Sequence, residues 1–258
     1  MLPKIFASDF DGVICDGLIE YFASTERAYR QIWSQQELIV NDELKNNFYR
    51  LRPVIETGWE MPVLLRALTL QYSPEKILTA WHSVRDEIVS QEKLDKKYCA
   101  QTLDRVRDNW IKNDLDTWLG FHRFYPKVIE RLKQIVNSDI HFYIVTTKEG
   151  RFVKQLLKQQ GIELSETQII GKESKRPKYE TLRMIKDNTQ ESNENIWFIE
   201  DRIQALKQVT QQPDLAGIKL FLADWGYNTE TEKASATEDS KLALLSLSQF
   251  AQDFQLWQ

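Results

Sequence analysis

A short apolar segment near the start of the chain leads directly into two aspartates and a glycine. Residues 4–7 predict a buried parallel strand, because the segment is apolar after its first residue and does not alternate with polar residues. Asp9 and Asp11 would then lie at the carboxyl end of this strand, where open α/β sheets bind ligands. Gly12 permits a sharp turn and a close approach of backbone N–H groups to a ligand. We therefore expect an anionic substrate here, with one aspartate attacking it and the other transferring protons.

Two simpler interpretations of this Asp-x-Asp-Gly pattern compete with a catalytic one. Aspartate after a strand often only caps the next element or lies in a solvated turn. The second interpretation is a calcium loop, whose twelfth position carries a glutamate ligand, and Glu20 does stand at the twelfth position counted from Asp9. However, Val13 and Ile14 occupy the positions where such a loop needs an oxygen ligand and a glycine. We therefore expect no calcium loop, and the choice between a cap and a catalytic motif depends on the rest of the chain.

Composition limits the classes of protein to which the chain can belong. Its 258 residues allow one large domain or two smaller ones, and 42% hydrophobic with 28% charged residues is typical of a soluble globular protein. A net charge of −4 argues against nucleic-acid binding. No apolar run approaches the roughly 20 residues of a membrane span, and the N-terminus lacks the apolar segment of a signal peptide. We therefore expect a cytoplasmic protein without a membrane or nucleic-acid partner.

The cysteines and histidines suggest no catalytic chemistry of their own. Cys15 and Cys99 fit a reducing compartment rather than a disulfide framework. Cys15 is close to the aspartates in sequence, but no histidine neighbours it, so we expect a buried filler rather than a nucleophile. The three histidines match no metal-ligand spacing, and we assign them no function.

Residues 18–122 predict helices and no strand. Five of the eight tryptophans lie here; on helical faces we expect them to be core, although one or two could stack on a sugar or base. The expected helices are residues 21–33, one that begins at Asn41 or Asp42 and runs toward Leu51, residues 60–72, one that starts at Ser73-Pro74, and one that contains Cys99, Leu103, Val106 and Trp110. This block is expected to be an all-helical insertion.

From residue 123 onward, strands and helices are expected to alternate. Connections of this kind produce right-handed crossovers on a parallel sheet. The predicted strands are residues 141–145, 168–171, 195–199 and 218–222, with helices after Tyr125-Pro126, over 149–160, from about 178 to 187, and up to 211. Residues 228–240 are expected to form a loose loop, and 242–254 a final helix.

Polar side chains follow three of the predicted strands at the point where each strand ends. Besides the two aspartates, Thr146 follows one strand, and Glu200 and Asp201 follow another. A lysine-rich turn over residues 172–178 precedes a helix between them. Each feature alone is weak evidence, but the carboxyl ends of parallel strands meet at one edge of a sheet. The sequence therefore predicts one site assembled from all four.

With these motifs in this order, the chain resembles the haloacid dehalogenase superfamily, specifically its phosphatases with a helical cap inserted after the first motif. The stretch Asp9-Phe10-Asp11-Gly12 matches the first motif, Thr146 the second, and Glu200-Asp201 the fourth. The match covers roughly residues 4–17 and 124–224, and the helical insertion matches in position and class only.

The resemblance implies an α/β fold with a Rossmann-like parallel-sheet core and an inserted all-α cap domain. The core domain would comprise residues 1–17 and 123–258, and the cap residues 18–122. The cap would select the substrate.

The resemblance also implies roles for individual residues. Asp9 would be the nucleophile that forms an aspartyl-phosphate, and Asp11 would protonate the leaving group and later activate water. Mg²⁺ would be held by the Asp9 carboxylate, the Asp11 backbone carbonyl and Asp201, with waters completing the oxygen ligands. Thr146 and a lysine would bind the oxygens of the transferring phosphoryl group.

The chain departs from the family pattern at the lysine. Family members usually carry lysine directly before proline, but Arg176 precedes Pro177 here. Lys178 is favoured, because Pro177 is expected at the first helical position and would place Lys178 in the first turn. Lys175 is a close second, and arginine itself could bind phosphate with a bulkier, forked geometry.

A second departure is in the fourth motif. Many members carry glycine before the metal-binding aspartate and another acid about four residues later, whereas Glu200 precedes Asp201 here and Ala205 follows it. Glu200 is therefore a candidate partner of the metal that replaces the missing acid.

We expect a Mg²⁺-dependent phosphatase that acts on a small phosphorylated metabolite. A phosphomutase with the same core is an alternative, and so is a degenerate relative that binds a phosphorylated ligand or a protein without catalysis. A dehalogenase is disfavoured by Asp11, because cleavage of a carbon–halogen bond needs no acid for its leaving group.

Overall fold

The computed structural model describes residues 2–257, which divide into two compact units. One unit, the core unit, comprises the chain up to Asp16 and again from Arg123 onward. The other, the helical unit, comprises Gly17–His122. Within residues 2–257, no helix has both the length and the apolar character needed to cross a bilayer.

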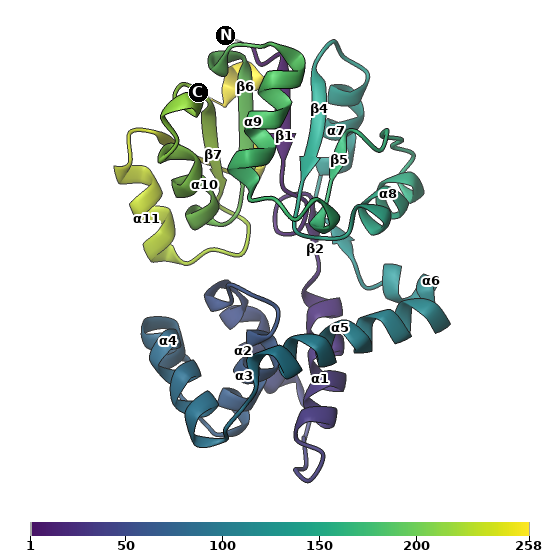
Figure 1. Cartoon of the computed structure of the whole chain (residues 1–258), viewed down its shortest axis with the longest axis vertical. Coiled ribbons are helices and arrows are strands. Elements are labelled where there is room, and N and C mark those ends of the chain that lie inside the picture. Colours follow the sequence, from purple (N-terminus) through teal and green to yellow (C-terminus); the bar gives the residue numbers. More distant parts are fainter. Residues whose placement is uncertain (1, 258) are drawn as a thin grey trace. The chain divides into compact units, whose positions relative to one another are not determined.

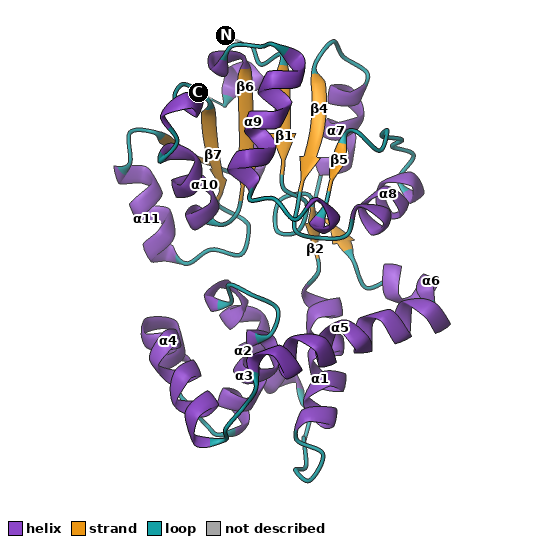
Figure 2. Ribbon diagram, viewed as in Figure 1, coloured by secondary structure: helices purple, strands orange, loops and turns teal. Residues whose placement is uncertain are grey.

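The core unit is built on a six-stranded sheet in which all neighbouring strands are parallel (Figures 1 and 2). This confirms the predicted α/β class. Every predicted strand is present. The first predicted strand lies inside the sheet, between β4 and β6, and all four of its residues are buried there, as its continuous apolar sequence predicts. The order is β5 (Ile169–Ile170), β4 (His141–Val145), β1 (Ile5–Ser8), β6 (Ile196–Glu200), β7 (Lys219–Ala223) and β8 (Leu242–Leu245).

Two helices, α9 (Lys178–Thr189) and α10 (Ile203–Thr210), cover one face of this sheet (Figure 1). Their apolar side chains pack against alternate strand residues such as Ala7 and Phe198. The other core helices are α7 (Val128–Val136), α8 (Gly150–Gln159), α11 (Glu230–Glu238) and α12 (Leu247–Phe250).

Aromatic residues fill the space on the opposite face. Phe6 of β1 and Trp197 of β6 point to this side, one residue out of step with the aliphatic face, because side chains alternate along a strand. Both rings pack edge to face against Phe254, with ring centroids 5.3 and 5.4 Å apart, and Trp257 lies beside them. The C-terminal segment thus closes the core beneath the sheet.

Two predictions for the C-terminal region are wrong. Residues 230–238 form α11 instead of a loose loop, and residues 242–254 form strand β8 followed by α12 instead of one helix. Each helix begins with a capping box, Thr229 with Glu232 and Ser246 with Gln249. This Ser/Thr-x-x-Glu/Gln pattern is visible in the sequence and marks both helix starts. β8 was missed because four apolar residues fit a helix or a strand equally well.

A pair of two-residue strands lies in the core unit where the chain leaves that unit and where it returns. β2 (Cys15–Asp16) pairs antiparallel with β3 (Arg123–Phe124), so both crossing points of the chain are hydrogen bonded to each other. Strands this short carry no periodicity, and the sequence did not predict them.

The helical unit contains only helices among its longer elements, as predicted (Figure 2). Asn41 caps the second helix by accepting from the backbone N–H of Leu44 at 2.8 Å, and Ser73 caps the fourth. The helices are α1 (Leu18–Ile32), α2 (Asp42–Leu51), α3 (Glu60–Thr69), α4 (Pro74–Gln91), α5 (Lys96–Asn113) and α6 (Leu115–Leu119).

Four of the five tryptophans of the helical unit are buried, namely Trp33, Trp81, Trp110 and Trp118. The indole N–H groups of three of these donate to Glu92, Glu60 and Glu20. Burial with a satisfied N–H is the arrangement expected of core tryptophan.

Candidate active site

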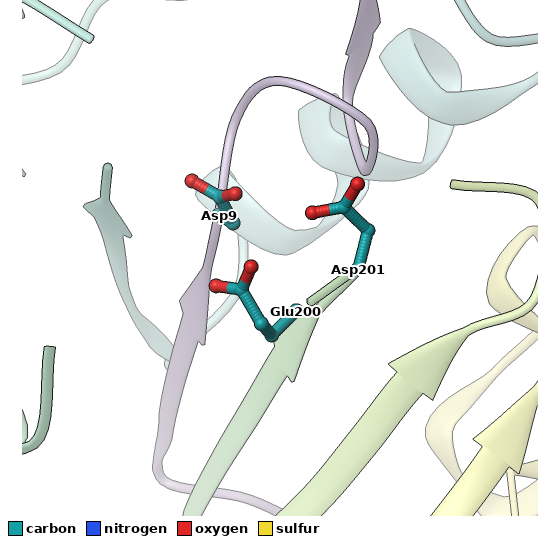
Figure 3. A group of neighbouring side chains, drawn as sticks. All are labelled: Asp9, Glu200 and Asp201. Carbon is teal, nitrogen blue, oxygen red and sulfur yellow. The ribbon is translucent and has the colours of Figure 1, made fainter. Parts of the chain in front are cut away.

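The carboxyl ends of β1 and β6 bring three acidic side chains together. Asp9 directly follows β1, and its backbone N–H continues the sheet by donating to Ile199 at 2.9 Å. Glu200 is the last residue of β6, and Asp201 is the next residue. Because β1 and β6 are adjacent and parallel, carboxylate oxygens of all three lie within 4.8 Å of one another (Figure 3). All three side chains are buried.

Lys178 provides a positive charge to this acidic cluster. Its Nζ lies 2.9 Å from Asp9 Oδ1 and donates a hydrogen bond to Glu200 Oε2. Burial alone would lower the pKa of Lys178, but the charges of Asp9 and Glu200 outweigh burial and raise that pKa above its usual value. Lys178 is therefore an ammonium that is held against two carboxylates.

Lys175 and Arg176, the other candidate cations of the turn before α9, lie elsewhere. Pro177 caps α9 and Lys178 is its first residue, so the proline stands one position earlier than predicted. Lys175 is exposed, in a left-handed backbone conformation with φ of 53°. The exposed Arg176 contacts Met184 within α9. Of the two candidate lysines, the structure brings Lys178 to the acidic cluster and leaves Lys175 in the solvated turn.

Burial of several acids in one place raises the pKa of two of these carboxyl groups. Burial, aided by the charge of Asp9, raises the pKa of Asp201 to about 6. Burial and the charge of Asp9 also raise the pKa of Glu200, although Lys178 opposes them. Three carboxylates with one ammonium leave an uncompensated negative charge, and an all-oxygen donor set is the kind that Mg²⁺ prefers. The residues present therefore fit a magnesium ion.

The three acids are not equivalent as ligands. Both oxygens of Glu200 accept hydrogen bonds from the protein, one from Lys178 and one from the Arg202 backbone N–H at 3.1 Å. Within residues 2–257, Asp201 makes one such side-chain bond, from the Tyr227 backbone N–H to Oδ2 at 2.7 Å. Asp201 and Asp9 are therefore better placed to coordinate an ion, and Glu200 to orient Lys178.

Two glycines surround the carboxylate of Asp201. Gly12 adopts φ of +88°, and a Cβ there would lie 2.1 Å from Asp201 Oδ2. A Cβ on Gly226 would lie 2.3 Å from Asp201 Cβ and 2.7 Å from the Gly12 carbonyl oxygen. Asn228 completes the arrangement by donating to the Asp201 carbonyl oxygen at 3.1 Å.

The segment after β7, residues 225–228, was not predicted to belong to the site. It supplies Gly226, Tyr227 and Asn228 to the surroundings of Asp201, and the Tyr227 hydroxyl donates to Asp16 at 2.8 Å. The rule that strand ends carry the site would have identified it, because β7 ends at Ala223.

Thr146 directly follows β4, Asp11 lies three residues beyond β1, and a lysine connects them. Thr146 is buried, and its Oγ1 accepts from the Lys148 backbone N–H at 3.1 Å. The side chain of Lys148 reaches Asp11, with Nζ 3.2 Å from Oδ1 and 3.4 Å from Oδ2. No role was predicted for Lys148 from the sequence, although it lies only two residues beyond Thr146.

Cys15 is buried, and burial together with the charge of Asp11 raises the pKa of its thiol far above the usual value. A thiol held protonated is a poor nucleophile, in agreement with its interpretation as a filler.

Comparison with known proteins identifies the family. A family model described as haloacid dehalogenase-like hydrolase matches residues 5–212. No curated protein matches the chain.

Solved structures share the fold over nearly the whole chain. A haloacid dehalogenase-like family hydrolase from Streptococcus pneumoniae is 13% identical with a TM-score of 0.61, covering 95% of this chain and 94% of that one. A protein named a predicted phosphatase from Clostridium acetobutylicum is 13% identical with a TM-score of 0.59 and 97% coverage of both chains. One named a predicted phosphoglycolate phosphatase from Haemophilus somnus is 17% identical with a TM-score of 0.57 and 88% coverage of both. At these identities, the likeness concerns the fold alone.

Proposed function

The chain belongs to the haloacid dehalogenase-like hydrolase family, and from this premise we propose that it is a Mg²⁺-dependent phosphatase acting on a small phosphomonoester. The observation that carries the proposal is the contact of Lys178 with Asp9, 2.9 Å apart at the carboxyl end of the central strand and next to Glu200 and Asp201. A carboxylate that attacks a phosphate dianion needs such a cation beside it, because the two anions otherwise repel each other. Structures of the same fold bear the names of phosphatases, which agrees with this activity.

In the first half of the proposed reaction, Asp9 is the nucleophile. One of its oxygens forms a bond to phosphorus while the ester P–O bond breaks, and Asp11 gives its proton to the departing oxygen. Lys178 and Thr146 hold the oxygens of the transferring phosphoryl group.

In the second half, Asp11 acts as a base. It takes a proton from water, whose oxygen attacks phosphorus and breaks the bond to Asp9, so that inorganic phosphate leaves and both aspartates return to their initial state. General acid–base catalysis of this kind contributes about 10²- to 10⁴-fold in rate.

Asp9, Asp201 and the backbone carbonyl of Asp11 would hold the magnesium ion, with Glu200 behind them. Bound there, Mg²⁺ would neutralise charge on the transferring phosphoryl group and fix its orientation. The protein's part is to bury the ligands and to orient them, as Tyr227 and the two glycines do for Asp201.

The helical unit, Gly17–His122, is proposed to act as the cap that selects the substrate. Its helices lie outside the segments that the family motifs cover.

The direct test is phosphate release from a panel of phosphorylated metabolites with Mg²⁺ present. We expect one or a few small phosphomonoesters to be hydrolysed, and the Asp9→Asn variant to be inactive on all of them. Analysis of the organic product separates a phosphatase from a phosphomutase, since a mutase returns an isomeric phosphate ester and little free phosphate. Ligand binding by wild type and variant without any turnover would contradict the proposal and favour a non-catalytic relative.

A further inference from the structure

We propose that Lys148 is a positioning residue for Asp11, the acid–base group of the function proposed above on which this inference rests. Its ammonium lies 3.2 Å from one oxygen of the Asp11 carboxylate and 3.4 Å from the other. Only 9% of the Lys148 side chain and 18% of the Asp11 side chain are exposed. This is a sheltered pair between two strand ends, and not one of the solvated surface pairs that contribute little.

The backbone of Lys148 is fixed at both of its polar groups. Its N–H donates to Thr146 Oγ1 at 3.1 Å, and its carbonyl oxygen accepts from the Lys172 N–H at 2.9 Å. The backbone at Gly171 passes close to this carbonyl oxygen, since a Cβ on Gly171 would lie 2.7 Å from it. The loops after β4 and β5 are thus joined at Lys148, and its side chain starts from a defined point.

The site therefore contains two lysines with separate carboxylate partners. Lys178 contacts Asp9 and Glu200, whereas Lys148 contacts Asp11. The first pairing bears on the attacking carboxylate, and the second bears on the carboxyl that exchanges a proton with the leaving oxygen. This division assigns Lys148 to proton transfer rather than to phosphoryl binding.

The hydrogen bond explains how Lys148 would act. Lys148 Nζ contacts both oxygens of the Asp11 carboxyl, so it holds that group in one orientation. The orientation of the carboxyl fixes the direction in which its proton points. Loss of this orientation slows proton transfer to the leaving group, because general acid catalysis depends on hydrogen-bond geometry.

Leaving groups provide the test. p-Nitrophenyl phosphate releases a stable phenolate that departs without a proton, whereas an alkyl phosphate requires one. We would measure kcat/KM for both esters with wild type, Lys148→Met, Lys148→Arg and Asp11→Asn. This ratio depends only on steps through the departure of the alcohol, so the later hydrolysis of the phosphoenzyme does not enter it.

We expect Lys148→Met to lower kcat/KM for the alkyl ester at least about 10-fold and to leave that for p-nitrophenyl phosphate within about 3-fold, a fraction of the full acid contribution. Lys148→Arg should restore part of the loss. Adding Lys148→Met to Asp11→Asn should cost nothing more on the alkyl ester, because the two groups act as a unit. Lys154→Met is the matched control, since Lys154 pairs with Glu166 at 3.2 Å on the surface of the core unit.

Three other results would contradict either this proposal or the proposed function. An equal loss on both esters would overturn the proposal and make Lys148 a phosphoryl-binding cation. No loss on either ester would also overturn it and leave the pair a structural one. Wild type that releases phosphate from neither ester, nor from any member of the metabolite panel, would instead contradict the proposed function, whatever Lys148 does.

Discussion

The ammonium nitrogen of Lys178 lies 2.9 Å from Oδ1 of Asp9 at the carboxyl end of the central strand. The two side chains are 12% and 8% exposed, so solvent screens their attraction only weakly. The same nitrogen also donates to Glu200. A phosphate dianion that approaches Asp9 therefore meets a carboxylate whose charge is already offset.

This contact predicts that Lys178→Ala lowers turnover by at least about 10²-fold, as for loss of one electrostatic partner of the transition state. Lys175→Ala should have a much smaller effect, because Lys175 is exposed in the turn before α9. Steady-state phosphate release measures both, and thermal unfolding checks that each variant is folded. Reversed effects would show that Lys175 is the family lysine.

Activity should depend on a divalent ion. EDTA is expected to abolish phosphate release, and Mg²⁺ to restore it. Asp201→Ala should raise the Mg²⁺ concentration needed for half-maximal activity sharply, because it removes a buried ligand from the cluster of Asp9, Glu200 and Asp201. Full activity in chelator would refute the metal site.

Gly226 is predicted to affect Mg²⁺ binding, because it leaves room for the side chain of Asp201. An alanine there would place Cβ 2.3 Å from Asp201 Cβ, so the aspartate must move. We expect Gly226→Ala to weaken Mg²⁺ activation by about 10- to 100-fold, the usual cost of disturbing the surroundings of a metal ligand. Gly58→Ala is the control, since its Cβ would make an ordinary 3.5 Å contact with Leu103. Equal Mg²⁺ titrations for Gly226→Ala and wild type would contradict this.

The raised pKa of Asp201 predicts how stability depends on pH without metal. Burial and the charge of Asp9 raise the folded-state pKa from 3.8 to about 6, so folding favours the protonated form. The contribution of this group to the free energy of unfolding is therefore complete below about pH 4 and is lost as pH rises through about 6.

Asp201→Asn should remove this dependence. In EDTA at pH 7.5 we expect the variant to resist denaturant better than wild type, and the gap to narrow at pH 5. Mg²⁺ should stabilise wild type more at pH 7.5 than at pH 5, since proton and metal compete for Asp201. Denaturant titrations measure all of these. A variant that is less stable than metal-free wild type at pH 7.5 would show that the ionised Asp201 carboxylate does not destabilise the folded protein.

The sequence predicted the positions that depend on strong local signals. The continuous apolar run before Asp9 identified the central strand, and the strand-end rule placed Thr146, Glu200 and Asp201 correctly on the carboxyl edge of one sheet. The choice of Lys178 over Lys175 rested on helix position, and the structure brings Lys178 to Asp9.

Other features depend on contacts between distant segments and were not predictable from local patterns. Lys148 reaches Asp11 across 137 positions of sequence, and Tyr227 reaches Asp201 across 26. The role of Gly226 becomes evident only from its close contact with Asp201 in the folded chain. In contrast, the capping boxes at Thr229 and Ser246 are local patterns, and they mark the starts of α11 and α12 in the sequence.

The central claim is that Asp9 carries the phosphoryl group, and trapping the intermediate tests it most directly. Enzyme mixed with its substrate is quenched in acid, reduced with borohydride, which converts an aspartyl-phosphate to homoserine, and mapped by peptide mass spectrometry. The account predicts homoserine at position 9 in wild type and none in Asp9→Asn, which should retain its fold and lose turnover. A reduced residue at any other position, or an Asp9→Asn variant that still releases phosphate, would contradict it.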